Sequence, residues 1–109
     1  MKTVRIAAAL KRLRKINDEI RYLSCFEQEQ FTSGLIAFKP AKKSNSKQIR
    51  HDHQDVICQV LQGSGRLRVD GRRIRLAPGI LCHIPKRTPH DFAAARSGEL
   101  VLLYLLIKS

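Results

Sequence analysis

Residues 66–76 alternate between charged and apolar side chains on the two sides of a short turn. Asp70-Gly71 forms the centre of the segment, and the apolar positions around it are Leu67, Val69, Ile74 and Leu76. A period of two is typical of a β-strand with one buried face, and Asp-Gly favours a type I′ hairpin turn. The pattern predicts a β-hairpin with one apolar face, which needs a second layer to bury it.

Further short runs have the composition of strands, and glycine or proline turns separate several of them. They lie at residues 31–38, 56–61, 80–84 and 100–107. The run at 100–107 is apolar on both faces, as expected of a central strand. Many short strands in a chain of this length predict an all-β barrel or sandwich.

The N-terminal segment has a different period. Apolar residues recur at spacings of three and four between residues 4 and 23, with basic residues between them, which predicts an amphipathic helix. We therefore divide the chain into a helical segment, residues 1–29, and a barrel domain, residues 30–109. The helix is expected to pack on the barrel or on a second subunit; a membrane-surface helix and a targeting peptide are alternatives. Residues 39–47 are interpreted as a polar loop.

Composition limits the classes of function. The 109 residues are enough for one domain, and no apolar run approaches the roughly 18 residues of a membrane span. Three cysteines without CxxC spacing argue against a disulfide framework and favour the cytoplasm. The sequence contains no GxSxG, Walker-type, GxGxxG or HExxH motif. The remaining candidates are the barrel pocket and the surface.

The net charge of +12 is partly concentrated in the hairpin. A two-residue turn at Asp70-Gly71 places Arg68 opposite Arg73 and Arg66 opposite Arg75. Like charges directly opposite in a sheet repel, so this surface should favour an anionic neighbour. The neighbour could be an acidic segment of a second subunit, bulk counterions or nucleic acid bound weakly and without sequence preference.

Two segments resemble the paired motifs of the cupin superfamily, specifically its small single-domain members. His51-Asp52-His53, followed by an apolar strand and Gly63, is similar to the first motif. Gly79, Pro85 and His90 match the second motif in spacing. The resemblance implies a cupin-like double-stranded β-helix, or jelly-roll barrel, here preceded by the amphipathic helix. It also implies a barrel pocket and a tendency to form homodimers.

The chain departs from the family pattern at several positions. Val56 stands where the first motif has a glutamate ligand, Arg87 where the second motif commonly has glycine, and Ala94 where it often has asparagine. Asp55 adjoins the vacant ligand position and could take the place of the glutamate. A neighbouring strand residue normally points to the opposite face, so this replacement would require a bulge or a shifted turn.

The resemblance and the residue chemistry together predict a metal site formed by His51, His53 and His90, with Asp55 as an additional candidate. Three imidazoles suit Zn, Ni, Fe, Mn or Cu and leave positions open for water or substrate. We expect a pocket for a small polar molecule, in an enzyme (oxygenase, isomerase or lyase) or in a noncatalytic sensor. A metal-free binding barrel and a basic interaction module are the alternatives. His83, outside the matched positions, is expected to be structural.

Overall fold

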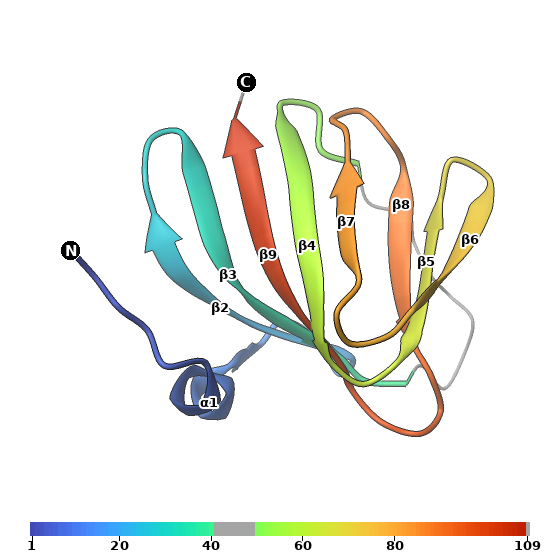
Figure 1. Cartoon of the computed structure of the whole chain (residues 1–109), viewed down its shortest axis with the longest axis horizontal. Helices are drawn as coiled ribbons and strands as arrows, with labels where there is room; N and C mark the ends of the chain where they lie inside the picture. The colour runs from blue at the N-terminus through green and yellow to red at the C-terminus, as the bar shows by residue number, and fades with distance from the viewer. Residues whose placement is uncertain (41–49, 109) are drawn as a thin grey trace.

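The computed structural model describes residues 1–40 and 50–108, which are mostly antiparallel β-strand (Figure 1). A helical turn, α1 (Ile6–Ala9), continues as a 3-10 helix over Leu10–Arg12. The strands are β1 (Arg14–Lys15), β2 (Ile20–Glu27), β3 (Phe31–Phe38), β4 (Gln54–Gln62), β5 (Gly65–Val69), β6 (Arg72–Leu76), β7 (Leu81–Ile84), β8 (His90–Ala94) and β9 (Leu100–Lys108).

The strands of the described residues form two facing sheets. The larger sheet has the order β1-β2-β3-β9-β4-β7 and the smaller one the order β6-β5-β8. Strand β9, apolar along most of its length, lies between β3 and β4, which confirms its predicted central position. The all-β jelly-roll class predicted from the sequence is confirmed, and α1 lies outside the barrel beside β2 (Figure 1).

The hairpin forms in the predicted register. Asp70 and Gly71 have φ values of 51° and 75°, as both central residues of a type I′ turn require. Arg68 is paired with Arg73, and Arg66 with Arg75. Gly63, at the preceding turn, has a φ of 78°, and a Cβ at this position would collide with the Glu99 carbonyl oxygen. Glycine is therefore required there for two reasons.

The core lies between the two sheets. Its most deeply buried members come from β4, β5, β6, β7 and β9; they are Val60, Leu67, Leu76, Ile84, Leu100 and Leu102. Leu67 and Leu76 are buried as the hairpin pattern predicts, whereas Ile74 of the same face is 38% exposed. The hairpin thus presents its apolar face to the larger sheet.

The helix predicted for residues 4–23 is wrong in extent. Helical structure covers only residues 6–12, and β2 begins at Ile20 and pairs with β3. The Asn17 side-chain oxygen accepts hydrogen bonds from the amides of Glu19 (2.8 Å) and Ile20 (2.9 Å). Such a side-chain turn competes with helical hydrogen bonding and reverses the chain into the sheet.

Two other expectations remain as they were. Most of the polar loop at residues 39–47 lies outside the described residues. The division of the chain between residues 29 and 30 stays a prediction. Strand β2, which lies before that division, belongs to the larger sheet through its pairing with β3. In the described part of the chain, no helix is long and apolar enough to cross a membrane.

Candidate functional site

A cavity of about 210 Å³ opens between the two sheets. Its walls are mainly aliphatic and aromatic side chains from both sheets, among them Ile36, Phe38, Val56, Phe92 and Leu102. Two histidines, His51 and His90, also line it. The barrel therefore contains a small apolar chamber with an imidazole pair in its wall.

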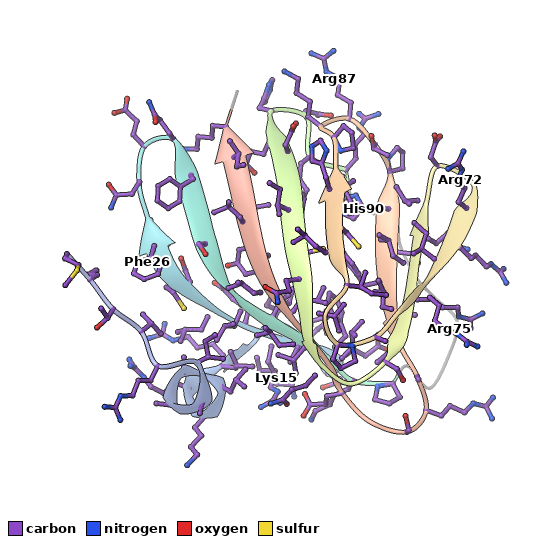
Figure 2. The ribbon with its side chains drawn as sticks, viewed as in Figure 1. Lys15, Phe26, Arg72, Arg75, Arg87 and His90 are labelled. Atoms are coloured by element: carbon purple, nitrogen blue, oxygen red, sulfur yellow. The ribbon has the colours of Figure 1, made fainter. Side chains whose placement is uncertain are left out.

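The histidine pair has a defined geometry. The ring centroids of His51 and His90 lie 5.7 Å apart, and the ring planes differ by 30°. His90, the first residue of β8, is only 3% exposed and lies inside the barrel (Figure 2). Its Nδ1 is 2.9 Å from the Thr88 carbonyl oxygen, and its ring meets Phe92 edge to face at 5.9 Å. Because a carbonyl oxygen only accepts, Nδ1 donates, and in the neutral ring Nε2 is the acceptor.

His51 is positioned by the loop that precedes β8. Its carbonyl oxygen accepts a hydrogen bond of 2.7 Å from the Arg87 amide. Burial, and then the nearby charge of His90, lower the pKa of His51 below its usual 6.5. The neutral imidazole is therefore the favoured form of His51 at neutral pH.

Arg87 has a φ of 67°, in the left-handed region that favours glycine. This conformation gives a physical reason for the glycine that the cupin pattern commonly has at this position. The arginine present here holds the same turn at a conformational cost.

The other two predicted ligands lie away from the cavity. His53 is exposed in the segment before β4 and is absent from the cavity wall. The Asp55 carboxylate accepts a hydrogen bond from the Lys86 amide (3.0 Å) and contacts His83 Nε2 at 3.0 Å. The hydrogen bond with His83, followed by that of Lys86, lowers the pKa of Asp55. His83 thus has a side-chain partner, Asp55, away from the cavity.

The donor set near the imidazole pair is incomplete for a metal ion. Within residues 1–40 and 50–108, no group of three or more His, Cys, Asp or Glu side chains is arranged to hold one. Val56, in the glutamate position of the motif, presents a hydrocarbon side chain to the cavity. As arranged here, the described residues do not fit a complete metal site.

The surface formed by Arg66, Arg68, Arg73 and Arg75 has an anionic neighbour within the same chain, which the sequence pattern did not indicate. Asp91 of β8 lies opposite Arg68, with Arg68 Nε 3.0 Å from Oδ1 and Nη2 3.3 Å from Oδ2. The Asp91 side chain is 8% exposed and that of Arg68 is 42% exposed. The pairing of β5 with β8 could have revealed this contact, but no local sequence signal predicts that pairing. Arg75 projects away from the barrel (Figure 2).

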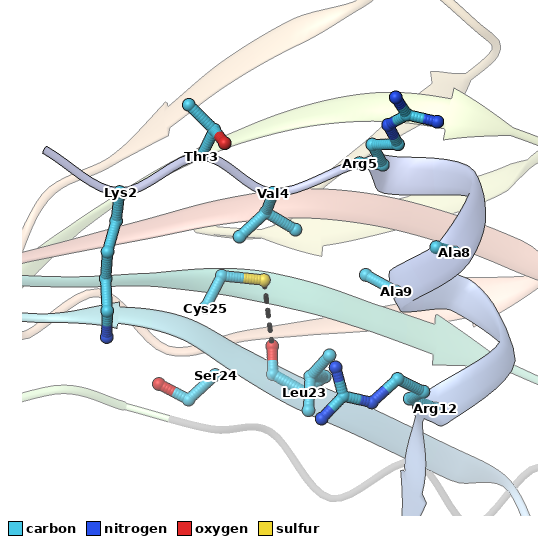
Figure 3. A pocket seen from close by; sticks show the side chains of 10 residues that line it. All are labelled: Lys2, Thr3, Val4, Arg5, Ala8, Ala9, Arg12, Leu23, Ser24 and Cys25. Atoms are coloured by element: carbon cyan, nitrogen blue, oxygen red, sulfur yellow. Dashed lines mark hydrogen bonds between the residues drawn. The ribbon is translucent and has the colours of Figure 1, made fainter.

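A second cleft, of about 400 Å³, lies between the N-terminal segment and β2 (Figure 3). Lys2, Arg5 and Arg12 line one part of it, and Ser24 and Cys25 of β2 another. Burial raises the pKa of the Cys25 thiol, although the charge of Arg12 opposes the rise. The cleft thus lies where the N-terminal segment and the helical turn pass over β2.

Comparison with known proteins agrees with this geometry. Residues 34–106 match the family described as Cupin domain. No curated protein gives a significant match.

Three solved structures illustrate the fold similarity. TT1209 from Thermus thermophilus is 26% identical, with a TM-score of 0.75, and the match covers 91% of this chain and 93% of that one. KdgF from Halomonas sp. is 20% identical, with a TM-score of 0.75 and coverages of 89% and 86%. Hydroxypropylphosphonic acid epoxidase from S. wedmorenis is 16% identical, with a TM-score of 0.76, and the match covers 85% of this chain but 53% of the epoxidase.

Proposed function

Because the chain belongs to the cupin domain family, we propose that its barrel cavity binds a small, mainly apolar molecule that carries one hydrogen-bond donor, such as a hydroxyl group. The observation that carries this proposal is the imidazole pair of His51 and His90 in an otherwise largely apolar wall. Ligand pockets of this kind use apolar walls for affinity and a few polar groups for orientation.

The size of the cavity limits the ligand. An apolar cavity of about 150 Å³ is enough to hold benzene. The 210 Å³ found here therefore suits a single substituted ring or an aliphatic molecule of similar volume. The sequence led us to expect a small polar ligand; we now propose a largely apolar molecule with one polar end.

The hydrogen bonding of His90 determines whether the polar end of the ligand donates or accepts a hydrogen bond. With Nδ1 donating to the Thr88 carbonyl, Nε2 of the neutral ring is left to accept a hydrogen bond from a ligand. Burial of His90 at 3% exposure removes competing water. A hydroxyl group near the imidazole pair would satisfy this acceptor, whereas a methyl group would leave it unpaired.

Phenol and toluene, which have nearly the same shape, test this proposal. Phenol should bind about 2–10 times more tightly than toluene, the ratio that corresponds to one net hydrogen bond. His90→Phe should abolish this preference, while His83→Gln, which changes a histidine on the outside of the barrel, should keep it. Titration followed by NMR measures both affinities for each variant. Equal binding of the two probes, or a preference that survives His90→Phe, would refute the assignment.

A divalent metal site is the second candidate, favoured by one specific observation. Metal-bound histidines commonly donate their other ring nitrogen to a carbonyl group, as His90 does to Thr88. His51 and His90 would be ligands, and His53 would have to turn inward as the third. A bound Zn, Ni, Fe, Mn or Cu ion would supply Lewis-acid polarisation of a ligand oxygen. Asp55 would join only by giving up its bonds to His83 and Lys86.

Metal analysis tests this candidate separately. Protein purified without a chelating tag and incubated with each ion should hold about one ion per chain, and His90→Ala should lose it while remaining folded. Wild-type protein that stays free of metal would exclude this candidate without affecting the phenol experiment.

Three other expectations stay predictions: the homodimer, the cytoplasmic location, and the basic interaction module built on Arg66, Arg68, Arg73 and Arg75.

A further inference from the structure

Two of the three cysteines lie directly opposite each other on neighbouring strands. Cys58 of β4 is paired in register with Cys82 of β7. Cys58 is 2% exposed, and Cys82 is partly buried against the same core cluster. Both are present as free thiols. The arrangement was not visible in the sequence, where 23 residues lie between them.

We propose that Cys58 and Cys82 are a site of reversible oxidation, at which a disulfide bond links edge strand β7 to β4. Directly opposed residues of an antiparallel pair have Cα atoms roughly 4.5–5.5 Å apart, within the range of about 4.4–6.8 Å found in disulfides. Their side chains also project from the same face of the sheet. The link therefore needs no change in which residues of the two strands are paired.

The distance between opposed Cβ atoms in a sheet is slightly longer than a disulfide bond prefers. Opposed Cβ atoms are about 4.5–5.5 Å apart in a sheet, whereas a disulfide requires about 3.5–4.5 Å. The two strands must approach by up to about 1 Å. Because β7 is an edge strand with β4 as its one sheet neighbour among the described residues, it can make this shift. A bond formed under such strain is easily reduced, which makes the site reversible.

The surroundings assign different roles to the two thiols. Burial, together with the neighbouring Cys82, raises the pKa of Cys58 to about 12. Burial also raises the pKa of Cys82, but its contact with Cys58 opposes that rise. Cys58 is 2% exposed, whereas Cys82 is only partly buried, so Cys82 is the more accessible of the two residues. Cys82 is the thiol that an oxidant meets first.

The reaction balances with a peroxide as the oxidant. The Cys82 thiolate attacks hydrogen peroxide and the O–O bond breaks; the proton that the thiol released joins the departing hydroxide, so the products are a sulfenic acid and one water molecule. The Cys58 sulfur then displaces the hydroxyl group, which leaves as a second water with the Cys58 proton, and the S–S bond forms. Both sulfurs are oxidised and the peroxide is reduced. Both thiols react as thiolates, so the rate should rise with pH above 7.

The experiment uses Cys25→Ser, which leaves only the opposed pair. The full-length variant is treated with hydrogen peroxide while folded, then unfolded and titrated for thiols, and its mass is measured. Cys25→Ser/Cys82→Ser serves as the matched control with one member of the pair. After peroxide treatment of the wild-type protein, trypsin should release the peptide of residues 51–66 joined by a disulfide bond to the peptide of residues 76–86. This peptide analysis gives an answer even if Cys25→Ser fails to fold.

The proposal expects both thiols of Cys25→Ser to disappear, with a mass loss of about 2 Da and no covalent dimer. Dithiothreitol should restore both, and the oxidised form should melt several degrees higher because the bond closes a loop of about 25 residues. Persisting thiols would overturn the proposal. So would oxygen addition without cross-linking, or covalent dimers that replace the internal link.

Discussion

Val56 is the position at which a single substitution should convert the cavity into a metal site. The side chain is 5% exposed and lines the cavity together with His51 and His90. Val56→Glu would add a carboxylate to the imidazole pair, giving the two-nitrogen, one-oxygen set that divalent transition metals accept. The expected result is a protein that is less stable without metal and is stabilised by it.

The size of both effects follows from the burial of the site. Removing a buried valine and placing a carboxyl group in an apolar wall should lower the free energy of unfolding by about 2–4 kcal/mol. For a domain near this size, that corresponds to a fall in melting temperature of roughly 10–25 °C. Zinc at 100 times its dissociation constant should return about 2.7 kcal/mol, because it binds only the folded state.

Thermal unfolding with zinc and with a chelator measures the rescue. Val56→Gln is the matched control, because glutamine has nearly the volume of glutamate and is also polar but supplies no carboxylate. Zinc should raise the melting temperature of Val56→Gln less than that of Val56→Glu. Adding His90→Ala to Val56→Glu should remove the rescue. A folded Val56→Glu protein with the same melting temperature with and without zinc would refute the placement of these three side chains around one point.

Three further predictions follow from single contacts. Arg87→Gly should raise the free energy of unfolding by up to about 1 kcal/mol in urea denaturation, since relief of the left-handed strain exceeds the added chain entropy, and Arg87→Val should lower it. The lowered pKa of His51 means that the unfolded chain binds this proton first, so stability should fall as pH drops below about 6.5, less steeply in His51→Gln; equal slopes would contradict this. Asp91→Asn should cost about 1–2 kcal/mol, and much less when Arg68 is already glutamine, as a double-mutant cycle would show.

The strands could be predicted from the sequence because their signals are local. The hairpin turn needs only Asp70-Gly71 and the alternation around it, and β3 has the predicted bounds. The helix could not be bounded in this way, since apolar spacings of three and four continue through residues that fold as a turn and a strand. The Asn17 side chain decides the outcome by hydrogen-bonding to two following amides. The spacing of apolar residues carries no information on that competition.

The candidate site was predictable only in part because it depends on contacts between distant strands. The motif spacing indicated His51 and His90, and the structure brings these two together in the cavity wall. The Arg68–Asp91 pair and the opposed cysteines depend on β5 pairing with β8 and β4 with β7. No turn residue or short-range pattern sets those two pairings, so the sequence alone left them open.

The alternation of β4 decides whether a carboxylate can reach the imidazole pair. Val56, Cys58 and Val60 point inward and are at most 5% exposed, so Asp55 belongs to the opposite face. A slip of one residue would bring Asp55 inside but would expose those three side chains, at roughly 1.5–3 kcal/mol for each large one. That loss is comparable with the whole stability of a domain, about 5–15 kcal/mol. The register with β9 is also unbroken from Gln54 to Val60, without the bulge that a local exception would need. In this register Asp55 therefore faces away from the cavity, and a carboxylate at residue 56, the glutamate position of the motif, would face the imidazole pair.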